Sequence, residues 1–223
     1  MIYVDGVKYS FESDLLIPDN FFLIPEFIIS APNNIKASSG FDAIAQALES
    51  MVSKKSNEAS LICAMKSLKI SSKSYLSFLD DPNIKNASDM CIASNLAGKA
   101  INISKTTVPH ATSYPFTSLF NISHGHAVSL FIESFFKYNF ENMHRSETNF
   151  DLKKRYELIF SLFNVKTIND FTNKISVIKK KAGLVDNLID LNKEQGEKIL
   201  DILSSLEELD DVQNIFTNAN LQT

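Results

Sequence analysis

Four side chains of types that bind divalent metals are spaced in a way that could bring them together. Asp42 and Gln46 are four positions apart in a segment of helical periodicity, so both leave one face of a helix. His110 and His124 are 14 positions apart, too far for one helical face but suited to two helices that meet across a turn. One carboxylate with two imidazoles is a common ligand set for a divalent transition metal. Spacing leaves an alternative open, in which the histidines are unrelated helix-end residues and Asp42 is a surface carboxylate.

The elements that must position these residues are predicted to be helices. Six glycines and six prolines are too few for the turns of an all-β protein of 223 residues. A short helical turn is expected around His110, between Pro109 and Pro115. Apolar residues recur with helical periodicity in the remaining segments. The expected helices cover residues 35–52, 56–68, 88–103, 123–138, 152–163, 168–181, 193–206 and 211–219.

The first 34 residues have a different pattern. Segments 8–11 and 21–24 are aromatic and β-branched, and prolines flank the second, which predicts two short strands. Two strands alone form a marginal sheet, so we expect them to pair with another domain or another chain. The predicted fold class is therefore all-α, a helical bundle over residues 35–223, preceded by a short β appendage over residues 1–34.

Composition excludes several classes of partner. The net charge of −4 does not suit a nucleic-acid-binding protein, which normally carries a basic face. No apolar run approaches the roughly 20 residues that span a bilayer, and the N-terminus lacks the pattern of a signal peptide. We therefore expect neither nucleic acid nor membrane as a partner, and a cytoplasmic location.

Three motifs together resemble the iron-containing (group III) alcohol dehydrogenases. They are SSGFDAIAQALES around Asp42, TTVPHATSY around His110 and FNISHGHA around His124, with AGKAIN before the second. The resemblance implies the helical C-terminal domain of the dehydroquinate synthase-like fold, and a divalent metal, Fe²⁺ or Zn²⁺, bound by Asp42, Gln46, His110 and His124. Gln46 stands where the family usually has a histidine, and a neutral amide is a weaker ligand than imidazole.

A branch resembling phosphonoacetaldehyde reductases is similar at Gln46 and in the runs AGKAINISKTT and HGHA. It implies reduction of phosphonoacetaldehyde to 2-hydroxyethylphosphonate. Lys105, Thr106 and Thr107 then offer one cation and two hydroxyl donors to the phosphonate dianion. The alternative for Lys105 is an exposed loop lysine. His126 is a candidate proton relay beside a metal ligand, or a solvent-facing histidine at a helix start.

The resemblance also implies hydride transfer from NAD(P)H to a small aldehyde, or from an alcohol to NAD(P)⁺. No glycine-rich dinucleotide-binding turn occurs among the six glycines. We therefore expect NAD(P)H to bind through a domain absent from this sequence, the start of the chain to be the remainder of that domain, and this chain to be inactive alone. The alternative function is a catalytically silent helical module whose strands mediate dimerisation, and a homodimer is expected.

Overall fold

The computed structural model describes residues 2–4, 7–9, 13–184, 194, 197, 198 and 201. The chain divides into two compact units, residues 1–184 and 185–223, and nearly all described residues belong to the first. That unit is dominated by helices, which confirms the predicted all-α fold class. The helices expected at 193–206 and 211–219 lie outside the described residues, apart from four isolated positions. The predicted domain boundary after residue 34 stays a prediction.

The described elements follow one another with short connections. Two strands, β1 (Ile2–Val4) and β2 (Val7–Tyr9), pair antiparallel with Ile2 opposite Tyr9. A 3₁₀ turn, η1 (Asp14–Leu16), comes next. The helices are α1 (Glu26–Ile29), α2 (Asn33–Val52), α3 (Glu58–Asp80), α4 (Ile84–Ser104), α5 (Val108–Phe120), α6 (His124–Glu141), η2 (Met143–Arg145), α7 (Leu152–Phe163) and α8 (Ile168–Lys181).

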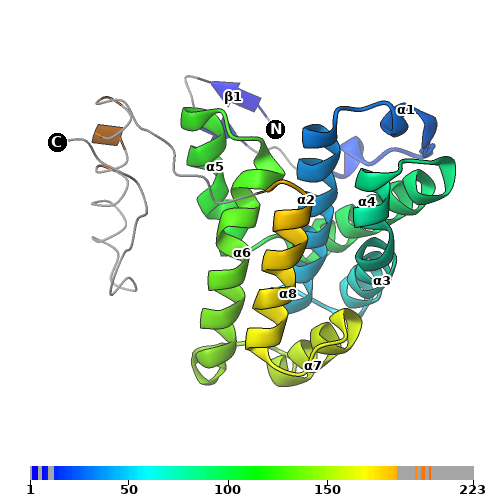
Figure 1. The fold of residues 1–223 in the computed structure, drawn as a ribbon. Coiled ribbons are helices and arrows are strands. Elements are labelled where there is room, and N and C mark those ends of the chain that lie inside the picture. The colour runs from blue at the N-terminus through cyan, green and yellow to red at the C-terminus, as the bar shows by residue number, and fades with distance from the viewer. Residues whose placement is uncertain are drawn as a thin grey trace. The chain divides into compact units, whose positions relative to one another are not determined.

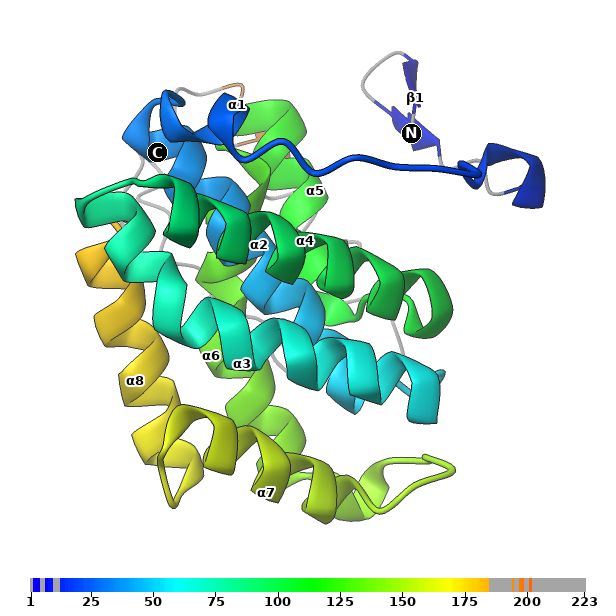
Figure 2. The ribbon, with the colours of Figure 1, turned by 90° about the vertical axis from the view of Figure 1, so that its right-hand side faces the viewer.

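Helix α2 is the central element of the bundle. It packs against α3 and α4 on one side and against α6 on the other, with α7 near its end (Figure 1). After a quarter turn about the vertical axis, α3 and α4 are seen side by side, crossing in front of α2 (Figure 2). Phe41, Ile44 and Leu48 of α2 are fully buried. Because α2 has neighbours on both sides, most of its residues belong to the core, and a polar side chain on it is placed with little freedom.

Local sequence signals set where the helices begin. At the start of α3, the Asn57 side chain accepts from the Ser60 N–H while the Ser60 hydroxyl accepts from the Asn57 N–H. Asn83 and Asn86 form the same reciprocal pair at α4, and Thr167 opens α8 in this way. Each pair satisfies two backbone N–H groups that the first helical turn leaves without partners.

Helix α3 runs twelve residues beyond the predicted end at residue 68. Serines on the buried face of α3 contact α4. Ser67 donates to the Ala93 carbonyl at 2.8 Å, and Ser74 donates to the Asp89 carboxylate at 2.8 Å. Small hydroxyl residues let the two helices approach closely, but they conceal the apolar periodicity by which a helix is predicted.

The predicted strand at residues 21–24 is wrong. This segment has no strand pairing in the structure, and its side chains are exposed, Phe22 by 86%. A strand requires a partner for its backbone hydrogen bonds, and the described strands β1 and β2 pair with each other. The prediction at residues 8–11 is confirmed for Lys8 and Tyr9, which lie in β2, and residues 10 and 11 lie outside the described part.

The helix that carries His110 is longer than predicted. Pro109 lies in the first turn of α5, where a missing N–H is tolerated, but Pro115 lies inside the helix instead of ending it. No helix in the described part of the chain has both the length and the apolar character needed to cross a membrane.

Candidate metal centre

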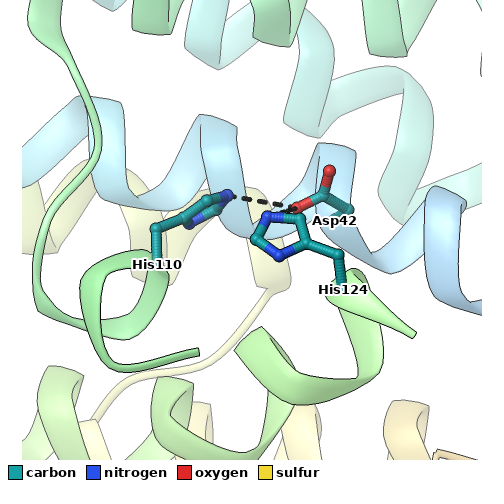
Figure 3. A group of neighbouring side chains, drawn as sticks. All are labelled: Asp42, His110 and His124. Carbon is teal, nitrogen blue, oxygen red and sulfur yellow. Dashed lines mark hydrogen bonds and ion pairs between the residues drawn. The ribbon is translucent and has the colours of Figure 1, made fainter. Parts of the chain in front are cut away.

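Three side chains from three helices converge on one point (Figure 3). Asp42 comes from α2, His110 from the first turn of α5, and His124 from the first position of α6. The Asp42 Oδ1 atom lies 3.1 Å from His110 Nε2 and 3.9 Å from His124 Nε2. One potential ligand atom from each residue lies within 4.8 Å of the other two. The structure therefore brings three of the predicted ligands to one point, and the fourth, Gln46, lies next to Asp42.

These separations suit a divalent metal. Ligand atoms about 2.1 Å from a tetrahedral zinc ion lie about 3.4 Å from one another. The two distances from Asp42 bracket that value, and the imidazole rings meet edge-to-face with centroids 5.3 Å apart. Donor types and spacing both fit Fe²⁺ or Zn²⁺, with coordination positions left over for another ligand.

The start of α6 is held unusually close to α2. A Cβ atom on Gly125 would lie 2.8 Å from the Ser38 carbonyl carbon, 2.9 Å from Asp42 Cβ, and closer still to the Ser38 carbonyl oxygen. The backbone N–H of His126 donates to Ser38 Oγ at 3.2 Å. A residue without a side chain at 125 is thus what allows the neighbouring His124 to reach Asp42.

His110 is held on its other side by a residue that sequence reasoning missed. Glu49 of α2 is 0% exposed, and its Oε1 atom is hydrogen-bonded to His110 Nδ1. Its Oε2 atom accepts from the backbone N–H of Thr107 at 2.6 Å and from the Thr107 hydroxyl at 2.7 Å. Glu49 comes seven positions after Asp42, so both lie on one face of α2. This spacing from Asp42, together with the position of an acidic residue inside an apolar helical pattern, is the feature of the sequence that could have identified Glu49.

The two carboxylates determine the charge of the His110 ring. Burial by itself lowers the pKa of His110, which is only 4% exposed. The hydrogen bonds to Asp42 and Glu49 outweigh burial and raise the pKa from 6.5 to about 9. Without a metal, His110 is therefore protonated at neutral pH, and a metal ion must replace the proton on Nε2.

Gln46 lies beside the centre and contacts Asp42 directly. Its Nε2 atom donates to Asp42 Oδ2 at 2.8 Å. The amide thus orients the carboxylate through the oxygen that does not face the histidines. Its predicted role as a fourth metal ligand stays a prediction.

The predicted phosphonate-binding residues follow α4 directly. Lys105 has φ 60° and ψ 176°, a backbone conformation that is almost confined to glycine. Ser104 holds this turn, since its hydroxyl lies 2.8 Å from Ser50 Oγ and 3.0 Å from the Lys105 carbonyl oxygen. Lys105, Thr106 and Thr107 are all half-buried, and their predicted role in binding a phosphonate stays a prediction. Thr107 already donates both of its protons to Glu49.

Tyr114 and Ser113 lie next to His124. The Tyr114 ring stacks on the His124 ring at 5.8 Å, with 8° between their planes. The Ser113 hydroxyl donates to the His110 carbonyl at 2.7 Å, and the same oxygen lies 3.5 Å from His124 Nδ1. Residues two apart leave a helix about 200° apart, so we expect the His126 ring to point away from that of His124. Its predicted role in proton transfer stays a prediction.

Residues 36–214 match the family described as Fe-containing alcohol dehydrogenase family, C-terminal. Among curated proteins, 1-propanol dehydrogenase of Salmonella typhimurium is 28% identical over 135 residues, which is 60% of this chain and 36% of that protein. Long-chain-alcohol dehydrogenase 1 of Geobacillus thermodenitrificans is 31% identical over 113 residues, 50% of this chain and 29% of that protein. The chain therefore spans less than half the length of these relatives.

Solved structures show the same fold. Sulfoacetaldehyde reductase from Bifidobacterium kashiwanohense in complex with NAD⁺ is 29% identical, with a TM-score of 0.68, over 80% of this chain and 46% of that one. An iron-containing alcohol dehydrogenase of Thermotoga maritima, 24% identical, has a TM-score of 0.64 over 86% of this chain and 48% of that one. With a family match over most of its length and the converging Asp42, His110 and His124, the chain belongs to the iron-containing alcohol dehydrogenase family and represents its C-terminal region.

Proposed function

We propose that this chain is the metal-binding part of an NAD(P)-dependent alcohol dehydrogenase or aldehyde reductase. The observation that carries the proposal is the convergence of Asp42, His110 and His124 from three helices. A divalent metal held there, Fe²⁺ or Zn²⁺, supplies Lewis-acid polarisation of a carbonyl oxygen. Reduction consumes one hydride from NAD(P)H and one proton, and gives the alcohol and NAD(P)⁺.

The chain's own contribution is to build and shield the centre. Glu49 and Asp42 hold His110 from both sides, and Gly125 brings His124 up to Asp42. The cofactor is proposed to bind through a dinucleotide-binding domain outside this sequence. The similar sulfoacetaldehyde reductase, of which this chain covers 46%, was crystallised in complex with NAD⁺, which supports NAD(P) as the cofactor.

The metal site is tested by the metal content of the purified chain after anaerobic loading with Fe²⁺ or Zn²⁺. About one metal ion per chain is expected, and the double variant Asp42→Ala, His124→Ala should bind none. His144→Ala is the matched control, because His144 is exposed in η2, away from the centre. Wild-type protein that binds no metal would contradict the proposal and favour the catalytically silent module.

The proposed substrate is a small aldehyde that carries an anionic group, with phosphonoacetaldehyde as the specific candidate. Lys105 supports this, since a lysine occupies a conformation that costs about 1–3 kcal/mol for a residue other than glycine. Thr106 and the start of α5 follow directly, and a helix N-terminus favours anions. Because the protons of Thr107 are already donated to Glu49, Lys105 and Thr106 are the proposed contacts to the phosphonate.

Three alcohols of similar length distinguish the substrate classes. Binding of 2-hydroxyethylphosphonate, 2-hydroxyethanesulfonate and 1-propanol to the zinc-loaded chain is measured by calorimetry. The phosphonate should bind most tightly, and Lys105→Met should weaken its binding about tenfold while leaving 1-propanol unaffected. If the sulfonate binds most tightly, the proposal of an anionic substrate stands, but the specific candidate becomes a sulfonate instead of a phosphonate. Equal binding of 1-propanol would contradict an anionic substrate.

A further inference from the structure

Helix α2 carries two carboxylates, Asp42 and Glu49, and the proposed ligand set gives no role to the buried Glu49. It is 0% exposed, and a buried carboxylate is costly unless its oxygens accept hydrogen bonds. Both oxygens of Glu49 accept hydrogen bonds. One is hydrogen-bonded to His110 Nδ1, and the other accepts two hydrogen bonds from Thr107. The hydrogen bonds of Glu49 thus connect it to a proposed metal ligand, His110, and to the loop that precedes this ligand.

We propose that Glu49 is a positioning residue that fixes the His110 ring for metal binding and ties the loop at residues 105–107 to the metal centre. This inference rests on the proposed function and adds a residue to it. A neutral imidazole offers a lone pair on Nε2 only when its proton is on Nδ1. A carboxylate at Nδ1 enforces that tautomer and holds the ring plane, while Nε2 faces Asp42.

The second oxygen extends the arrangement to the proposed substrate loop. Thr107 donates its N–H and its hydroxyl to that oxygen, so the loop cannot move without moving Glu49. The other end of the loop is fixed to α2 as well, because the Ser104 hydroxyl donates to Ser50 Oγ of α2 at 2.8 Å. Ser53, the residue that follows α2, also donates from its Oγ to the Ser104 carbonyl at 2.5 Å. Loop position and His110 orientation are therefore set by the same helix, α2, through side chains within two turns of each other.

Glu49→Gln is the informative substitution, because an amide has nearly the same shape but cannot make the same bonds. If its NH₂ group faces His110, Nδ1 must become the acceptor and the proton moves to Nε2, where it blocks the metal. If the NH₂ group faces Thr107, two N–H donors oppose each other. Zinc affinity should therefore fall about 10- to 100-fold, measured on the full 223-residue chain by competition with a chromophoric chelator.

Two further variants separate positioning from folding. Thr107→Val removes one of the bonds to Glu49 but keeps the N–H, so zinc affinity should fall only a few-fold. Glu133→Gln is the matched control, since this carboxylate on α6 pairs with Lys179 at 2.7 Å. Glu133 comes nine residues after His124, about 13 Å along the helix axis, and its loss should leave zinc affinity unchanged.

A spectroscopic readout completes the test. The Co²⁺-loaded wild type and Glu49→Gln variant should differ in their visible absorption bands, because an altered His110 donor changes the ligand field. Wild-type zinc affinity and an unchanged Co²⁺ spectrum in Glu49→Gln would overturn the positioning role, and leave the proposed function standing. Wild-type protein that binds neither ion would overturn the proposed function together with this inference.

Discussion

Replacing Gly125 by alanine tests whether the metal centre depends on the close approach of α6 to α2. The added Cβ would meet the Ser38 carbonyl carbon at 2.8 Å, whereas ordinary contacts are 3.4 Å or longer. The start of α6 must therefore retreat by more than about 0.6 Å, because a backbone carbonyl, unlike a side chain, cannot rotate away. Overpacking of this kind costs about 1–3 kcal/mol. For Gly125→Ala we expect a destabilisation near the upper end of this range, reduced by up to about 1 kcal/mol because alanine has a higher helix propensity than glycine.

Gly98 provides the matched control. It lies in α4, and a Cβ there would meet nothing within 4 Å. Gly98→Ala should therefore stabilise the chain by about 0.5–1 kcal/mol. The two alanine variants should differ by about 3 kcal/mol in the free energy of unfolding, measured by urea titration followed by circular dichroism.

Zinc affinity should separate the two variants even more clearly. Retreat of α6 carries His124 away from Asp42, from which its Nε2 atom is already 3.9 Å distant, so Gly125→Ala should lose most of its affinity. Gly98→Ala should bind zinc like the wild type. A Gly125→Ala chain with wild-type stability and affinity would refute the argument that this contact positions His124.

Three further outcomes are expected. In the metal-free chain, the pKa of His110 is about 9 in the folded state against 6.5 unfolded, so the protonated ring stabilises the fold fully below pH 6.5. That contribution, about 3 kcal/mol, should be lost as the pH rises through 9, and urea titrations at pH 6 and pH 9.5 should show the loss in the wild type but not in His110→Gln. Gln46→His should raise zinc affinity at least about tenfold in chelator competition, since imidazole is the stronger ligand, and unchanged affinity would place residue 46 outside the coordination sphere. Lys105→Gly should raise the urea midpoint by relieving about 1–3 kcal/mol of backbone strain while weakening 2-hydroxyethylphosphonate binding, and a lower midpoint would contradict the strain.

The sequence predicts the long amphipathic helices well. Helices α7 and α8 have the predicted bounds, because their apolar periodicity is strong and a capping residue, Asp151 or Thr167, directly precedes each. Helix α3 was predicted too short, since its buried face at Ser67, Ser71 and Ser74 uses small polar residues. Segment 21–24 has the composition of a strand but no partner strand in the described residues. The composition of a segment indicates its burial and its strand propensity, whereas strand pairing depends on whether the rest of the fold supplies a partner strand.

The candidate site was predicted in part for a similar reason. Asp42, His110 and His124 could be selected because their types and spacing are those of a metal site. Glu49 was missed: its spacing from Asp42 marks it as a candidate, but its role depends on Thr107 and His110, which lie about 60 positions away and reach it only in the folded chain. The strained backbone of Lys105 is likewise invisible in a residue pattern.

The wide separation of the three proposed ligands along the chain means that metal binding should also affect the stability of the fold. His124 comes 82 positions after Asp42, and His110 lies between them on a different helix. A bound ion is then a cross-link that closes a long segment of chain and fastens three helices at one point, much as a disulfide does. Since the unfolded chain offers no such cluster, free metal at a thousand times its dissociation constant should stabilise the fold by about 4 kcal/mol. The ion that is proposed to activate a substrate should thus also determine how well the fold withstands heat.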